Sequence, residues 1–292
     1  MRRATRPPSP RVSILISVVL AAGALVGCAG GGDGQADETG PVPVGSVSHV
    51  HGLGVNRGDG KVYVATHHGL YRVDRPGRAA PVGPRQDTMG FTVTGPDRFL
   101  GSGHPAPGTD APPHLGLIES TDAGASWATR SLSGQADFHG LVYAHDTVYG
   151  HDATSGMLRV STDKRAWDDR ARVAAADIAV SPADPDTLLA TTEQGVARST
   201  DGGRTFASGN GQVQLLLAWP AAATLYGIDP GGTLSRSGDA GATWRAVGTA
   251  PGGPPQALTA VDERRLLAAT ATGVYESRDG GATFTQLLPL SE

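Results

Sequence analysis

Residues 237–244 read Ser237-Gly238-Asp239-Ala240-Gly241-Ala242-Thr243-Trp244, and the same eight-residue pattern, here called the box, recurs along the chain. Further well-formed boxes begin at Ser120, Ser199 and Ser277, and a damaged copy occupies residues 161–167. Successive copies start 41, 38, 38 and 40 residues apart. A regular period near forty residues indicates a repeat protein, so the repeat predicts the architecture before any single residue is given a function.

Each repeat contains short β-like segments separated by turns rather than amphipathic helices. In the first repeat these segments cover residues 50–55, 61–66 and 70–73, and a fourth follows the place of the box. The first repeat has no box of its own, but residues 69–74 align with residues 273–279 of the last repeat. No apolar positions recur at a spacing of 3.6 residues. We therefore predict an all-β, six-bladed β-propeller over residues 45–292, with four strands per blade, in preference to seven blades.

The residue types of the box explain why the same pattern recurs along the chain. An aspartate caps the backbone amides of a tight turn, a glycine adopts a positive φ that other residues resist, and the final aromatic side chain is expected to be buried. The box residues are therefore predicted to shape turns and not to carry chemistry.

The box, in the form S-x-D-x-G-x-[ST]-[WF], resembles the Asp-box or BNR repeat of bacterial sialidases and related propellers. Two further stretches, His49-Val50-His51-Gly52-Leu53-Gly54 and Ala65-Thr66-His67-His68-Gly69-Leu70-Tyr71, resemble a family of actinobacterial lipoproteins that are labelled sialidase-like glycosylhydrolases. The resemblance covers most of the chain. It implies a propeller with Asp-box turns and, as one functional alternative, a sialidase-like exo-glycoside hydrolase.

The first residues of the chain have the pattern of a bacterial lipoprotein signal. Arginines at positions 2, 3, 6 and 11 precede an apolar stretch over residues 12–26, and Leu25-Val26-Gly27-Cys28 has the form of a lipobox. Cys28 is the only cysteine, which suits a lipidation site rather than a disulfide. We predict a signal peptide over residues 1–27, lipidation of Cys28 and a flexible tether over 28–44. The protein would then be extracytoplasmic and anchored to the bacterial cell membrane.

The charge of the chain argues against nucleic-acid binding. The formal net charge is −4 at pH 7, and Lys and Arg do not cluster in a basic stripe. Glycine supplies 42 of the 292 residues, as expected for a fold with many turns.

The histidines are concentrated in the first half of the chain, at positions 49, 51, 67, 68, 104, 114, 139, 145 and 151. When the repeats are superposed, His51 and His139 occupy the same place at the start of the innermost strand. A second ring of polar residues falls where the second strand turns into the third. At the face opposite the boxes we predict a ligand-binding site that contains His51, His67, His68, His104, His139 and His151.

Three interpretations of this cluster stay open. Imidazoles suit copper or zinc, and His49, His51 and His139 are the candidate metal ligands. The cluster could instead form a metal-free pocket for a glycan or small molecule, or its histidines could bind backbone groups at loop crossings. The insertion over residues 104–114, which is rich in proline, is expected to be an ordered flap over the same face or an exposed decoration.

Glycoside hydrolysis is the competing hypothesis, and it requires two carboxyl groups that flank the scissile bond. The carboxylates expected at this face are Asp87, Asp137, Asp177, Glu193 and Asp229. The candidate catalytic residues among them are Glu193, Asp137 and Asp229. The chain lacks the Phe/Tyr-Arg-Ile-Pro segment of sialidases, and its tyrosines lie within strand patterns. Whether the protein is an enzyme is therefore left open at this stage.

Overall fold

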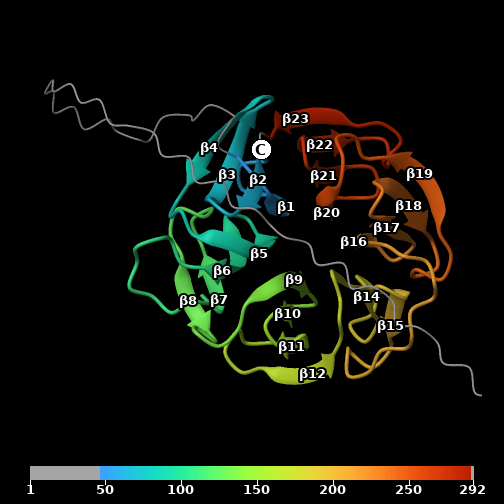
Figure 1. Cartoon of the computed structure of the whole chain (residues 1–292), viewed down its shortest axis with the longest axis horizontal. Helices are drawn as coiled ribbons and strands as arrows, with labels where there is room; N and C mark the ends of the chain where they lie inside the picture. Colours follow the sequence, from blue (N-terminus) through green and yellow to red (C-terminus); the bar gives the residue numbers. More distant parts are fainter. Residues whose placement is uncertain (1–46, 291–292) are drawn as a thin grey trace, which may run out of the picture. The chain divides into compact units, whose positions relative to one another are not determined.

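A computed structural model describes residues 47–290 of the chain, and this part is all-β. Six separate sheets surround a central channel (Figure 1). Each sheet is formed by strands that follow one another in the sequence, and we number these sheets as blades 1 to 6. No helix within residues 47–290 is long and apolar enough to cross a membrane. The prediction of a six-bladed all-β propeller is confirmed.

The strands of the first three blades are as follows. Blade 1 contains β1 (Val50–Val55), β2 (Val62–Thr66), β3 (Gly69–Arg75) and β4 (Arg78–Val82). Blade 2 contains β5 (Asp87–Gly95), β6 (Arg98–His104), β7 (Leu117–Ser120) and β8 (Ala128–Ser131). Blade 3 contains β9 (Phe138–Ala144), β10 (Thr147–Asp152), β11 (Met157–Ser161) and β12 (Asp168–Arg172).

The remaining blades complete the ring. Blade 4 contains β13 (Ile178–Val180), β14 (Leu188–Thr192) and β15 (Gly195–Ser199). Blade 5 contains β16 (Leu216–Ala221), β17 (Thr224–Ile228), β18 (Thr233–Ser237) and β19 (Arg245–Thr249). Blade 6 contains β20 (Pro255–Ala260), β21 (Leu266–Thr270), β22 (Gly273–Ser277) and β23 (Thr285–Pro289). The first strand of each blade lies next to the channel and the last lies at the periphery (Figure 1).

Blade 4 differs from the prediction of four strands per blade, because it has only three. The chain that follows its box does not form a regular ladder with β15. Ala207 N donates to Arg198 O at 2.8 Å and Asn210 N to Val196 O at 3.2 Å, but Gly211 adopts a φ of 80°. The Gly209-Asn210-Gly211 sequence favours a turn here, which interrupts the outer strand.

The box turns have the hydrogen bonds that their residue types predict. In the box of blade 5, Ser237 Oγ donates to Asp239 Oδ1 at 2.7 Å and accepts from Gly241 N at 2.9 Å. Thr243 closes the turn, since its N donates to Asp239 Oδ1 at 2.9 Å and its Oγ1 to Asp239 Oδ2 at 2.6 Å. These bonds from Thr243 and Ser237 lower the pKa of Asp239 to about 2. The aromatic residues that end the boxes are half-buried against the blade cores.

The box glycines carry a prediction for stability. Gly281 has a φ of 91°, and a Cβ added there would lie 2.1 Å from Leu234 Cδ2, in the fully buried core between blades 5 and 6. We expect Gly281→Ala to reduce the free energy of unfolding by about 3 kcal/mol, from the positive φ and the overpacking together.

Gly60 is the matched control for this substitution. It also has a positive φ, 70°, but nothing lies within 4 Å of an added Cβ. Gly60→Ala should therefore cost only about 1 kcal/mol. Urea unfolding of both variants measures the difference, and equal losses would show that packing behind the box does not matter.

The ring closes where blade 6 meets blade 1, without a strand shared between the two sheets in the described part of the chain. Val50 N donates to Gln256 Oε1 at 2.9 Å, and Thr259 Oγ1 donates to Leu53 O at 2.8 Å. At the periphery, Gly77 N donates to Leu287 O at 2.8 Å. Apolar side chains of both blades form one buried cluster, so packing and a few hydrogen bonds hold this junction together.

Candidate functional site

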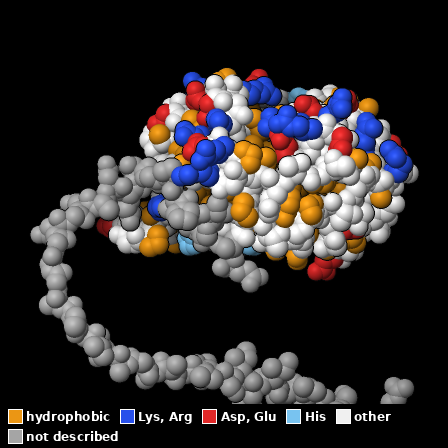
Figure 2. All heavy atoms as spheres, turned by 90° about the horizontal axis from the view of Figure 1, so that it is seen from above, with side chains coloured by type: hydrophobic (Ala, Val, Ile, Leu, Met, Phe, Trp, Pro, Cys, Tyr) orange, Lys and Arg blue, Asp and Glu red, His pale blue; other side chains and the backbone are white. Residues whose placement is uncertain are grey.

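Histidines and aspartates from blades 1 to 3 meet at the face of the propeller where first strands begin and second strands end. We call this set the histidine rim: it comprises His49, His51, His67, Asp87, His104, His114, Asp137 and His139. Figure 2 shows the propeller edge-on, with Lys and Arg side chains gathered along one edge and imidazole atoms visible at both edges. The histidine rim brings together many groups that can bind a cation.

The first group within the rim consists of His49, His51 and His67. One ring nitrogen from each lies within 4.8 Å of the others. The ring centroids are 4.3 to 5.2 Å apart, and His51 Nε2 lies 3.2 Å from His67 Nδ1. Asp87 completes the group, because its Oδ1 is 3.1 Å from His67 Nδ1 and 3.7 Å from His51 Nε2.

The backbone conformation of His49 is energetically unfavourable. His49 directly precedes β1 and has a φ of 31°, which residues other than glycine rarely adopt. Strained backbone of this kind concentrates at functional positions, where the surrounding structure imposes it.

The electrostatics of the first group keep His51 neutral. Burial, with smaller contributions from the charges of His67 and His49, lowers the pKa of His51 to about 4, although the charge of Asp87 acts to raise it. Burial and the charge of His67 also lower the pKa of His49. At neutral pH both imidazoles therefore have a free lone pair, which is the form that binds metal ions.

The second group consists of His104, His114 and Asp137, and one ligand atom of each lies within 4.8 Å of the others. Asp137 Oδ2 is 3.2 Å from His104 Nε2 and 3.9 Å from His114 Nδ1. It is also 3.0 Å from His139 Nε2. Asp87 links the two groups, because its Oδ2 lies 3.2 Å from His104 Nδ1.

Asp137 is an anion in this setting. Burial alone would raise its pKa, but the hydrogen bond from His139 and the charges of His139, His104 and His114 lower it below its ordinary value. A buried carboxylate surrounded by imidazoles is an arrangement that favours a bound cation.

Three other predicted site residues belong to neither group of three. His68 is exposed in the turn between β2 and β3 and lines the cavity that His67 and His104 border. His151 is buried, with its Nε2 2.8 Å from Val173 O, as in a structural hydrogen bond. His139 contacts Asp137, so the structure groups His49 and His51 with His67 rather than with the expected His139.

The candidate catalytic carboxylates do not come together. Glu193 is exposed in the turn between β14 and β15, in blade 4. Asp229 Oδ1 accepts from Gly231 N and Thr233 N, both at 2.9 Å, and so shapes a turn of blade 5. Of the three candidates, only Asp137 belongs to the histidine rim as defined above.

The sequence placed Asp87 at this face, but its role as a link between two histidine groups and the contribution of His114 were not predicted. A signal for Asp87 existed in the repeat, because Asp87-Thr88-Met89 occupies the place of His49-Val50-His51 in blade 1 and of Asp137-Phe138-His139 in blade 3. His114 has no such signal, since it lies in the insertion that interrupts blade 2. That insertion is not a remote decoration: its Pro105 and Pro107 border a cavity of about 560 Å³, which is also lined by His67, His104 and Arg85.

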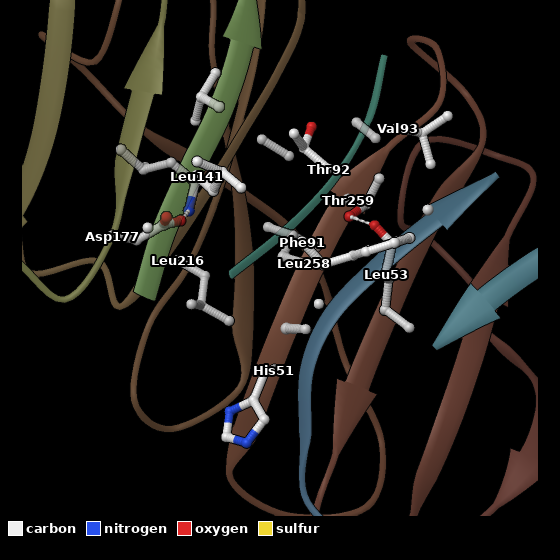
Figure 3. Close-up of a pocket in the computed structure, with 18 of the residues that line it drawn as sticks. His51, Leu53, Phe91, Thr92, Val93, Leu141, Asp177, Leu216, Leu258 and Thr259 are labelled. Carbon is white, nitrogen blue, oxygen red and sulfur yellow. Dashed lines mark hydrogen bonds between the residues drawn. The ribbon is translucent and has the colours of Figure 1, made fainter. Parts of the chain in front are cut away.

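The central channel opens beside the rim and has a volume of about 350 Å³. His51 lies at one end, and Phe91, Leu141 and Leu258 contribute apolar side chains to a wall that also contains polar groups (Figure 3). Asp177 is the carboxylate in this wall, and it accepts Leu217 N and Ile178 N, both at 2.8 Å. Burial outweighs these two hydrogen bonds and raises the pKa of Asp177 to about 7.

No protein-family profile and no curated protein matches this chain. Among solved structures, the chain resembles the GH74 enzyme of Niastella koreensis, with a TM-score of 0.60 and 18% identity over 85% of this chain and 46% of that one. A chain of the nidogen/laminin complex matches with a TM-score of 0.58 and 13% identity, over 77% of this chain and 92% of that one. Virginiamycin B lyase of Staphylococcus aureus matches with a TM-score of 0.53 and 13% identity, over 83% of this chain and 82% of that one. The chain spans less than half the length of the GH74 enzyme, and identities this low show the propeller fold alone.

Proposed function

We propose that this protein is a lipid-anchored, extracytoplasmic propeller of the Asp-box type that binds a transition-metal ion at His49, His51 and His67. The observation that carries the proposal is the approach of three imidazole nitrogens to within 4.8 Å of one another, at a face next to the central channel.

The chemistry of this group suits zinc or copper. Imidazole nitrogen is a common ligand of both ions. His51 is neutral at neutral pH, so no proton competes strongly for its lone pair. Asp87 lies beside His67 in the way that outer carboxylates orient metal-binding histidines. Three protein ligands would leave a coordination position open to a small molecule or glycan from solution.

The lipid anchor and the location rest on the sequence, because residues 1–27, Cys28 and the tether 28–44 lie outside the described residues. The lipobox and the single cysteine support them. The Asp-box identity of the repeats is supported by their pattern and by the hydrogen bonds of the box turns.

The sialidase-like alternative has weaker support. A glycosidase needs a general acid with a raised pKa beside a second carboxylate. Asp137 has a lowered pKa, and Glu193 and Asp229 belong to turns of other blades. Asp177 has a raised pKa, but no second Asp or Glu among the described residues lines the channel beside it. The resemblance to GH74 enzymes concerns the fold and brings no catalytic residues with it.

The test is a calorimetric titration of the purified, chelator-treated full chain with Zn²⁺, and a parallel titration with Cu²⁺. His67→Ala should remove one equivalent of bound metal, with an affinity loss greater than about a hundredfold, because even outer-shell changes cost about 10- to 100-fold.

His68→Ala is the matched control, since His68 is also exposed in the same turn but outside the group. It should bind as the wild type does. A wild-type chain that binds neither metal, or equal losses in the two variants, would refute the proposed site.

A further inference from the structure

A second set of potential ligands lies across Asp87 from the first, and the function proposed above makes no use of it. His104 ends β6, His114 comes from the insertion of blade 2, and Asp137 precedes β9. Three separate segments of the chain thus bring one imidazole or carboxylate each to within 4.8 Å of the others.

Two buried polar atoms in this second group have no hydrogen-bond partner. Asp137 is only 4% exposed, and its Oδ1 is paired with no group among the described residues. The same holds for His114 Nδ1, which lies 3.9 Å from Asp137 Oδ2. Unpaired buried polar atoms are unfavourable and rare in folded proteins, so each requires an explanation. A bound metal ion would satisfy both.

His104 provides an independent argument, because it lies between two carboxylates. Its Nδ1 is 3.2 Å from Asp87 Oδ2, and its Nε2 is 3.2 Å from Asp137 Oδ2. A neutral imidazole has a single N–H group and can donate to only one of them. When Nδ1 donates to Asp87, the lone pair of Nε2 faces the oxygen of Asp137, and the two repel unless a cation, either a proton or a metal ion, lies between them. Carboxylate, histidine and metal in series is the usual arrangement around protein-bound zinc.

We propose that the chain binds a second transition-metal ion at His104, His114 and Asp137, so that the histidine rim holds one ion on each side of Asp87. That the rim holds two ions rests on the proposed function, because the first ion is the one bound by His49, His51 and His67. The second site is argued separately, from the contacts of His104, His114 and Asp137. His139, 3.0 Å from Asp137 Oδ2, orients this carboxylate from outside the site. The nitrogen and oxygen ligands suit Zn²⁺, with room for a water or a ligand atom in the fourth position.

The experiment counts Zn²⁺ equivalents on the purified full chain by calorimetry and by elemental analysis after dialysis. The wild type and the His68→Ala control should each hold two equivalents. His114→Ala should hold one, and so should His67→Ala, while the double variant should hold none. His114→Gln, which preserves side-chain bulk, repeats the test if the alanine variant unfolds, and thermal unfolding monitors the fold of every variant.

The outcomes separate the two proposals. One equivalent in the wild type that His67→Ala removes and His114→Ala retains would overturn the second site and leave the proposed function standing. One equivalent that His114→Ala removes and His67→Ala retains would support the second site and overturn the first. A chain without bound Zn²⁺ would overturn both.

Discussion

Relative to an Asp177→Asn variant, the wild-type protein is expected to lose up to about 4 kcal/mol of folding stability as the pH rises from about 4 to about 8. Burial raises the pKa of Asp177 from 3.8 to about 7 in the folded protein. A group with a raised pKa contributes stability that is fully present below its unfolded pKa and is lost as the pH passes the folded value. Asparagine does not titrate, so the difference between the two proteins isolates this carboxyl group.

The comparison with a variant is necessary because His51 acts in the opposite direction. Its pKa is lowered from 6.5 to about 4, so its contribution to stability is lost as the pH falls through that window. In the wild type alone the two effects overlap and partly cancel. Both proteins contain His51, so its contribution is absent from their difference.

Urea unfolding of the two proteins at several pH values measures this difference. Asp110→Asn is the control, because it makes the same substitution at an exposed aspartate in the insertion of blade 2. Its stability should follow that of the wild type at every pH. If the stability of Asp177→Asn does so as well, the carboxyl group of Asp177 is not buried in the way described.

Cys28→Ala is expected to abolish the mature, lipidated form of the protein completely. Lipidation of the cysteine sulfur precedes cleavage of a lipoprotein signal peptide, so a chain without this sulfur should remain an uncleaved precursor or become soluble. Ser17→Ala, which changes the apolar stretch but keeps Cys28, should be processed normally. Membrane fractionation with detection of the mature chain gives the answer, and a Cys28→Ala protein that is still processed and membrane-bound would exclude the lipid anchor.

The architecture could be predicted from the sequence because its signals are local and repeated. Each box contains all the groups of its own turn, so the hydrogen bonds of Asp239 and Thr243 follow from residues only four positions apart. The absence of a fourth strand in blade 4 was not predicted from the sequence, because it depends on a short Gly209-Asn210-Gly211 turn after an otherwise normal box.

The partners of the histidines could be predicted only in part. His51 and His139 do occupy equivalent places in their blades, but the repeat pattern does not predict which side chains of other segments each of them contacts. His151 lies one residue before the end of the second strand of its blade, and His104 ends the second strand of blade 2. His151 Nε2 nevertheless lies 2.8 Å from Val173 O, whereas His104 lies between two aspartates. His114 reaches the rim through an insertion that no other blade has. Contacts between blades depend on loop paths, which the periodicity of the sequence does not encode.

The histidine rim draws all its residues from positions 49 to 139, and this has a consequence for how the molecule can vary. Blades 1 to 3 supply every chemical group of the rim, whereas blades 4 to 6 close the circle around the channel. The two halves of the ring are therefore under different constraints. Turns of blades 5 and 6 supply none of the rim residues, but a shift of one residue in β5 or β9 would displace Asp87 or Asp137. Within one ring of repeated units, the groups that can bind a cation are thus gathered in one half.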